Sequence, residues 1–254
     1  MIFAIDVGNT NIVLGAYEDD KLVMTARMAT DKLKMADEYA IAISDIMKLH
    51  GCPPKKFEGA VISSVVPQLI PTLRSAIKVL LGVKTVIVGP GVKTGLNIKT
   101  DNPAILGSDM VCSSVGATLK YPMPCIVIDL GTSTTVAALD NSRAFIGCSI
   151  CPGVRLSLKA LSENAAQLPF INLDPTDKII GTNTVDSMKS GILFGHAAML
   201  DGMIERYKEI LGENTYVVAT GGLAPAIISN CKSEITVDDN LILDGLLSIY
   251  KRNS

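Results

Sequence analysis

The 254-residue chain has no tryptophan, only two histidines and few aromatic residues, which make up 4% of the sequence. Nearly half of the residues are nevertheless hydrophobic, so we expect an aliphatic core and either one large domain or two small ones. The net charge is −2 with both signs interspersed, which gives no electrostatic footprint for nucleic acid or for an anionic membrane.

The chain also lacks a long apolar run at its N-terminus. Asp6 interrupts the first apolar stretch after five residues, and no basic region precedes it. We therefore expect neither a signal peptide nor a membrane-spanning segment, no membrane or nucleic-acid partner, and by default a cytoplasmic location.

The six cysteines do not suggest a disulfide framework in a chain of this kind. Cys148 and Cys151 form a C-x-x-C pair, but a zinc site needs four nitrogen or sulfur ligands, and no second such pair is present. A redox pair remains open. Because the pair lies in an apolar run that ends at Pro152, we expect two buried small side chains.

Two short segments of the chain share one pattern. Residues 3–13 read FAIDVGNTNIV, and residues 126–136 read IVIDLGTSTTV. Each copy is an apolar strand, an aspartate, a glycine turn with hydroxyl and amide side chains, and a second apolar strand. At a constant offset, the corresponding pairs are Asp6 and Asp129, Gly8 and Gly131, Thr10 and Ser133, and Val13 and Val136.

This pattern has the chemistry of a phosphate site. An aspartate at a strand end can hold a hydrated cation, and a glycine lets backbone N–H groups approach an anion closely. A single Asp-x-Gly segment is typical of an ordinary hairpin turn. Two copies in matching contexts favour a nucleotide clamp, in which facing loops bind a metal–polyphosphate from both sides.

The two loops resemble the phosphate-loop signature of the sugar kinase, actin and heat-shock ATPase superfamily. Within it, nearly the whole chain resembles the type III pantothenate kinase family. The segments that carry this resemblance, in order, are residues 6–11 (DVGNTN), 89–95 (GPGVKTG), 101–103 (DNP), 107–109 (GSD), 129–132 (DLGT), 152–153 (PG), 181–184 (GTNT), 190–191 (SG) and 219–224 (ATGGLA).

The resemblance implies an α/β fold of duplicated ribonuclease H-like domains, the actin-like ATPase fold, with a cleft between them. The hydrophobic periodicity agrees, because strand–strand–strand–helix–strand–helix occurs twice. We place one half at residues 1–121 and the other at 122–254, joined at residues 121–124 (YPMP). Strands are expected at 2–7, 11–16, 22–27, 59–64, 84–88, 125–130, 134–139, 143–150, 215–219 and 234–237, and helices at 35–49, 68–81, 107–120, 155–166, 186–211, 222–230 and 240–251.

The activity that the resemblance implies is ATP-dependent phosphorylation of pantothenate to 4′-phosphopantothenate, the first step of coenzyme A biosynthesis. The implied cofactors are ATP, Mg²⁺ and a monovalent cation, K⁺ or NH₄⁺, and the implied assembly is a homodimer. Two alternatives remain open: a kinase of the same superfamily that acts on another small hydroxyl acceptor, and a catalytically decayed nucleotide-binding protein.

The same resemblance implies roles for individual positions. Asp6 would organise Mg²⁺ through water, Asp129 would bind the monovalent cation, and Thr184 would contact the substrate near the dimer interface. The implied nucleotide-binding positions are Asp6, Val7, Gly8, Asn9, Thr10, Asn11, Ile12, Val13, Thr132, Gly221 and Gly222. The implied substrate-binding positions are Thr100, Gly107, Ser108, Asp109, Met110 and Thr184.

Asp109 matches the family's general base, which takes the proton of the substrate hydroxyl. Because the segment GSD begins a helix, we expect the partial positive charge of the helix N-terminus to lower the pKa of Asp109. A base of low pKa is adequate, since phosphoryl transfer is loose and proton removal need only be late. An isolated aspartate at this place would instead indicate a helix cap.

The chain departs from the family at two substrate positions. Thr100 stands where the family usually has tyrosine, and Met110 stands where it usually has an arginine that faces the acceptor. A guanidinium binds a planar carboxylate through paired hydrogen bonds, and methionine offers no donor. We expect Lys99 or Lys93 to compensate. The alternative is a less anionic acceptor or decayed catalysis.

Two glycine-rich segments follow apolar strands. Residues 89–95 fit neither the dinucleotide-binding pattern, since the third glycine is one place late, nor the P-loop pattern, since Val92 precedes the lysine. We expect a turn there, either lining the site or simply connecting elements. Gly221 and Gly222 would let a flat ring lie against the backbone, as in the superfamily's adenosine loop.

Overall fold

The structure, a computed structural model, describes residues 1–254, and the chain divides into two compact units. Unit 1 consists of Met1–Leu96, Asp101–Leu119 and Asn240–Ser254, and unit 2 consists of Asn97–Thr100 and Lys120–Asp239. Residues 240–254 thus belong to unit 1, whereas the sequence-based division counts them with the C-terminal half. No helix is long and apolar enough to cross a membrane.

Unit 1 is built on a five-stranded sheet in the order β3-β2-β1-β4-β5. The central strand β1 runs antiparallel to β2 and parallel to β4. The strands are β1 (Ile2–Val7), β2 (Asn11–Glu18), β3 (Lys21–Ala29), β4 (Gly59–Ser64) and β5 (Thr85–Ile87). The helices of the unit are α1 (Ala36–Leu49), α2 (Ile70–Leu81), α3 (Ser108–Lys120) and α7 (Leu241–Asn253), with short 3₁₀ turns at Pro54–Lys56, Pro67–Leu69 and Pro103–Ile105.

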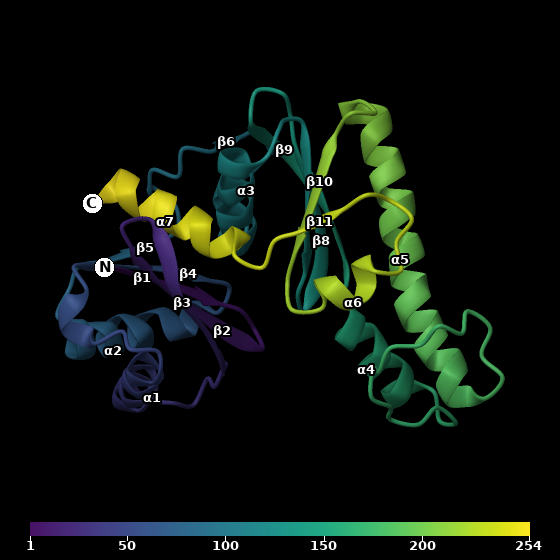
Figure 1. The fold of residues 1–254 in the computed structure, drawn as a ribbon, viewed down its shortest axis with the longest axis horizontal. Coiled ribbons are helices and arrows are strands. Elements are labelled where there is room, and N and C mark those ends of the chain that lie inside the picture. The colour runs from purple at the N-terminus through teal and green to yellow at the C-terminus, as the bar shows by residue number, and fades with distance from the viewer. The chain divides into compact units, whose positions relative to one another are not determined.

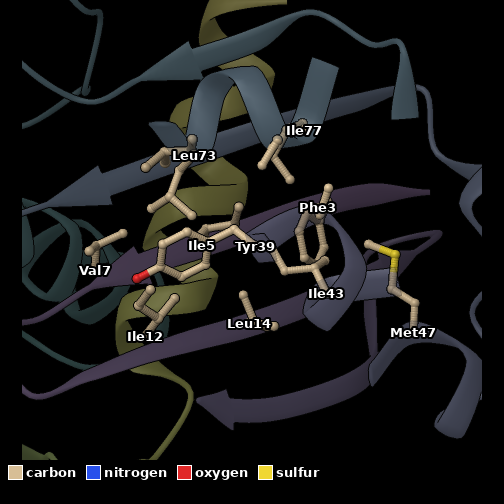
Figure 2. Close-up of a cluster of buried hydrophobic side chains, with 14 of the residues drawn as sticks. Phe3, Ile5, Val7, Ile12, Leu14, Tyr39, Ile43, Met47, Leu73 and Ile77 are labelled. Atoms are coloured by element: carbon tan, nitrogen blue, oxygen red, sulfur yellow. The ribbon is translucent and has the colours of Figure 1, made fainter. Parts of the chain in front are cut away.

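One face of this sheet packs against α1 and α2. Alternate residues of β1 point toward these helices, because successive side chains of a strand lie on opposite faces. Figure 2 shows the resulting cluster of fully buried side chains, each of which contributes about 1.5–3 kcal/mol by leaving water. Its labelled members are Phe3, Ile5, Val7, Ile12, Leu14, Tyr39, Ile43, Met47, Leu73 and Ile77.

The opposite face of the sheet, which carries Asp6, packs against α7, while α3 packs against α7 in turn. Glycines allow these elements to approach closely. A Cβ at Gly59 would collide with the Tyr250 ring, and Cβ atoms at Gly116 and Gly245 would collide with backbone atoms of α7 and α3. This packing explains why the last helix of the chain belongs to the first unit (Figure 1).

Unit 2 is built on a six-stranded sheet in the order β11-β10-β7-β8-β9-β6. Its helices pack aliphatic side chains against β7, β8 and β10. The strands are β6 (Asn97–Ile98), β7 (Cys125–Leu130), β8 (Ser133–Leu139), β9 (Ala144–Pro152), β10 (Tyr216–Thr220) and β11 (Thr236–Val237), and the helices are α4 (Val154–Asn164), α5 (Thr184–Leu211) and α6 (Ala224–Ile228).

The two sheets confirm the expected duplication. With β7 in the place of β1, the order 9-8-7-10-11 repeats the order 3-2-1-4-5, and every strand pairing has the same sense in both copies. Even the register shift recurs, between Ala16 and Tyr17 in β2 and between Ala138 and Leu139 in β8.

The expectation of a constant offset between the two phosphate-loop segments is wrong for the positions that follow Gly8 and Gly131. The N–H of Gly8 donates to the carbonyl of Asn11 (3.0 Å), whereas the N–H of Gly131 donates to that of Ser133 (3.1 Å). The first turn is therefore one residue longer. In the paired strands Asp6 lies opposite Val13. A constant offset would place Val136 opposite Asp129, but the residue opposite Asp129 is Thr135.

The expected burial of Cys148 is also wrong, because this thiol is exposed. The strand β6 pairs with β9 only at Ala144 and Phe145, so beyond that point β9 is bordered by β8 alone. Cys151 is half-buried, and both cysteines are free thiols.

Candidate active site

The first phosphate loop follows directly on β1. The turn from Gly8 to Asn11 is closed by its own backbone hydrogen bond, and the Thr30 hydroxyl donates to the Gly8 carbonyl at 2.7 Å. Asn9, Thr10 and Asn11 are exposed. Polar groups of this turn are therefore accessible to a ligand while the turn itself is held in shape.

Three of the nucleotide-binding positions expected from the sequence are less exposed than residues 9–11 of the turn. The side chains of Val7 and Ile12 are fully buried in the core of unit 1. Val13 is half-buried. At Val7 and Ile12 only the backbone is left to face a nucleotide.

Asp6 is a buried carboxyl at the end of β1, with 8% of its surface exposed. Burial raises its pKa from 3.8 to about 7, and the neighbouring Asp109 carboxylate acts in the same direction. The polar Ser63 hydroxyl beside it lowers the pKa and so opposes both effects. A buried carboxyl with so little compensation gains strongly from a nearby cation, so Asp6 fits the role of a magnesium-organising residue.

The donor set also fits Mg²⁺ in its composition. No cluster of three or more histidine, cysteine, aspartate or glutamate side chains that could hold a metal ion is present. Mg²⁺ usually keeps several waters and is bound by one or two carboxylates together with substrate phosphates. A single carboxylate beside a phosphate loop is therefore sufficient for a nucleotide-bound ion.

Asp109 lies in the first turn of α3, where the sequence predicts it. It is close enough to Asp6 for its negative charge to raise the pKa of that carboxyl. Burial raises the pKa of Asp109, although hydrogen bonds from the backbone N–H groups of Met110 and of Asp109 itself lower it. The expectation of a lowered pKa is thus wrong, because desolvation outweighs the helix N-terminus. A Cβ at Gly107 would lie 2.5 Å from Oδ1 of Asp109, so a larger residue there would displace the Asp109 carboxylate.

Ser63, which sequence reasoning missed, lies between these groups. It is opposite Asp6 in the β1–β4 register, and its hydroxyl donates to Oγ of Ser108 at 3.0 Å. The N–H of Ser64 donates to the same Ser108 oxygen at 3.0 Å. The only sequence signal was a hydroxyl pair that ends the apolar run 59–64.

The second phosphate loop, in unit 2, has an equally tight backbone. A Cβ at Gly221, where φ is +102°, would lie 2.8 Å from Oδ1 of Asp129. A Cβ at Gly153 would collide with the carbonyl oxygens of Gly131 and Thr132. Asp129, these backbone oxygens and the Gly221 turn therefore lie together, an oxygen-rich arrangement of the kind that hard cations prefer. The neighbouring Gly222 is exposed.

The expected substrate positions fall in both units. Thr184 begins α5 and lines a cavity of about 570 Å³ in unit 2, together with Leu161, Leu168 and Met188. Asn183 caps this helix by accepting the N–H of Asp186 at 2.9 Å. The cavity combines aliphatic walls with polar groups at the N-terminus of α5, so it suits a small molecule that has both apolar and polar parts.

Thr100 and Met110 mark the departures from the family pattern. The hydroxyl oxygen of Thr100 is buried without a hydrogen-bond partner, and Met110 is half-buried. The expected compensation by Lys99 is not supported, because its ammonium group already pairs with Asp140 at 2.8 Å. Lys93 is exposed and remains the candidate.

Comparisons with known proteins agree with this geometry. A family model described as type III pantothenate kinase matches residues 2–206. Curated proteins called type III pantothenate kinase, from Halalkalibacterium halodurans and an Exiguobacterium species, are each 42% identical over 253 residues; the match covers all of this chain and 100% and 99% of those proteins.

Solved structures of low sequence identity share the fold. Component A of (R)-2-hydroxyglutaryl-CoA dehydratase from Acidaminococcus fermentans has a TM-score of 0.57 at 16% identity, with full coverage of both chains. The activator of 2-hydroxyisocaproyl-CoA dehydratase from Clostridium difficile, solved with bound ADPNP, has a TM-score of 0.56 at 13% identity, covering 99% of this chain and 94% of that one. The architecture is thus the duplicated α/β fold of the actin-like ATPases, and the chain belongs to the type III pantothenate kinase family.

Proposed function

We propose that the protein transfers the γ-phosphoryl group of ATP to the primary hydroxyl of pantothenate, giving 4′-phosphopantothenate in the first step of coenzyme A biosynthesis. Family membership supports the reaction. The observation that supports the mechanism most directly is that two carboxyls, the buried Asp6 and the half-buried Asp109, interact electrostatically within unit 1.

In this mechanism Asp109 is the general base. Its carboxylate accepts the proton of the acceptor hydroxyl as the bond to phosphorus forms, and burial makes it a stronger base than an exposed aspartate. Asp6 would hold Mg²⁺, and backbone and side-chain groups of Gly8 to Asn11 would bind phosphate oxygens. Mg²⁺, when bound, neutralises charge on the transferring phosphates.

Unit 2 supplies the second set of ligands. We assign Asp129 to a monovalent cation, K⁺ or NH₄⁺, Thr132 to a phosphate contact, and Gly221 and Gly222 to the adenosine. The positive φ of Gly221 and its contact with Asp129 support a role for this turn that no side chain could replace.

The acceptor site requires a homodimer in this proposal, with Thr184 of one subunit contacting the substrate of the other. Large apolar side chains near the cavity are exposed, among them Phe170 (76%), Ile179 (62%) and Ile180 (80%). Side chains of this kind gain free energy when covered by a partner. Multi-angle light scattering should therefore give twice the mass of the 26.9 kDa chain at micromolar concentration, and a monomer would contradict the assignment.

A coupled ADP-release assay tests the reaction itself. We expect ADP release that depends on pantothenate, requires Mg²⁺ and increases on replacing Na⁺ by K⁺ or NH₄⁺, with mass spectrometry showing one added phosphate on the acceptor. A panel of other small alcohols is the control. Turnover of another acceptor in preference to pantothenate would support the alternative of a different small-molecule kinase, and no turnover with any acceptor would support a decayed nucleotide-binding protein.

A further inference from the structure

Ser63 is a buried hydroxyl at the centre of unit 1 that the mechanism above does not use. It lies at the end of β4 with 0% of its surface exposed, and it is the register partner of Asp6 on β1. Partners in adjacent strands point to the same face of a sheet, so both side chains lie on the face away from α1 and α2. A hydroxyl this deeply buried is costly unless it is hydrogen bonded.

The Ser63 hydroxyl joins two elements that carry the reacting machinery. Its single O–H donates to Oγ of Ser108, the first residue of α3, at 3.0 Å, and its side chain lies beside the Asp6 carboxyl, its register partner on β1. The N–H of Ser64 donates to the same oxygen. Ser108 thus accepts two hydrogen bonds, which occupy both lone pairs of its oxygen and leave its own proton directed elsewhere.

The register contact between Asp6 and Ser63 and the hydrogen bonds to Ser108 together connect the end of β1 with the start of α3. Asp6 is at one end of this connection, and Asp109, the next residue after Ser108, is at the other. The neighbouring Ser64 hydroxyl does not take part in this connection, because it donates to the carbonyl of Val66 and accepts a hydrogen bond from the N–H of Val66. The link between β1 and α3 is therefore specific to the side chain of Ser63.

We propose that Ser63 is a positioning residue for phosphoryl transfer, which holds Asp6 and Asp109 at a fixed separation by packing beside Asp6 and hydrogen bonding to Ser108. The inference rests on the proposed function, since it assigns the base to Asp109 and the magnesium-organising role to Asp6. In-line transfer depends on alignment of the base with the metal-bound phosphate, and a misplacement of about 1 Å can cost about 100-fold in rate.

The test compares Ser63→Ala with Ser64→Ala, which removes the same group one residue away. We expect Ser63→Ala to lower kcat about 10- to 100-fold while the KM values for ATP and pantothenate change less than about 3-fold, because every group that contacts a ligand remains. Ser64→Ala should keep kcat within about 2-fold of wild type. Circular dichroism and melting temperature are measured for both.

A double-mutant cycle with Ser108→Ala separates positioning from packing. If Ser63 acts through Ser108, the double variant should be no slower than the slower single variant. Unchanged kcat in Ser63→Ala, an equal loss in Ser64→Ala, independent multiplicative losses in the cycle, or unfolding of Ser63→Ala would each overturn the proposal. Absence of wild-type pantothenate phosphorylation would instead refute the proposed function, and the cycle would then be measured with the acceptor that the wild type does phosphorylate.

Discussion

Replacing Asp6 by asparagine should stabilise the metal-free protein at alkaline pH while abolishing kinase activity. In the unfolded chain the Asp6 carboxyl has its ordinary pKa of 3.8, whereas burial beside Asp109 raises the pKa to about 7 in the folded protein. Between these values the folded state holds a proton that the unfolded state has released. The free energy of unfolding therefore falls as the pH rises from about 4 to 7.

The magnitude follows from the size of the shift. About three pKa units correspond to about 4 kcal/mol of stability that is present below pH 4 and lost above pH 7. Asparagine has no proton to lose, so the advantage of Asp6→Asn should grow across this window, reduced by about 1 kcal/mol for an imperfect hydrogen bond. For a chain of this size, about 3 kcal/mol raises the melting temperature by roughly 6–12 °C.

Thermal unfolding in EDTA at pH 5, 6, 7 and 8 measures this effect. Asp140→Asn is the matched control of opposite sign, because hydrogen bonds from Lys99 and Ser142 lower the pKa of Asp140. That variant should be less stable than wild type by about the same amount at all four pH values, because the stability that Asp140 contributes is lost only below its ordinary pKa of 3.8. If the advantage of Asp6→Asn does not increase between pH 5 and pH 8, the raised pKa of Asp6 is refuted.

Three further substitutions test the assigned roles. Asp109→Asn should lower turnover by ~10²–10⁴ with nearly unchanged ATP binding, and it should remove the rise of kcat/KM with pH that a base of raised pKa produces; a variant with more than half of wild-type turnover would refute the base. Asp129→Asn should abolish stimulation by K⁺ or NH₄⁺, and equal wild-type activity in Na⁺ alone would count against a cation site. Thr100→Tyr combined with Met110→Arg should lower the KM for pantothenate by roughly 10- to 100-fold, since a charge-assisted contact is worth about 1.5–3 kcal/mol; no gain, together with faster turnover of another acceptor by the native chain, would remove pantothenate as substrate.

Much of the fold could be predicted because its elements have strong local signals. The strand–aspartate–glycine segments and the helical periodicities predict nearly all strands and helices, and the internal repeat predicts that the same element order occurs twice. The assignment of α7 to unit 1 could not be predicted in this way. An amphipathic helix shows that it has a buried face, but the partner of that face depends on close glycine contacts at Gly59, Gly116 and Gly245.

In the candidate site, too, some features could be predicted from the sequence and others depend on tertiary contacts. Asp6 and Asp109 were found from motifs, but the sign of the pKa shift of Asp109 was not, because it depends on how far burial outweighs the helix N-terminus. Ser63 gave almost no signal, since a serine at the end of an apolar strand has many explanations. Only the register between β1 and β4 brings it beside Asp6.

The placement of α7 has a consequence for how the protein is made. Unit 1 starts with β1 (Ile2–Val7), but it is completed by α7 (Leu241–Asn253), which follows unit 2 in the chain. The intervening residues Lys120–Asp239 take about 6–24 s to translate at ~5–20 residues per second. During this time the face of the sheet that α7 covers stays exposed to solvent. Unit 1 therefore cannot complete its folding until unit 2 has been translated.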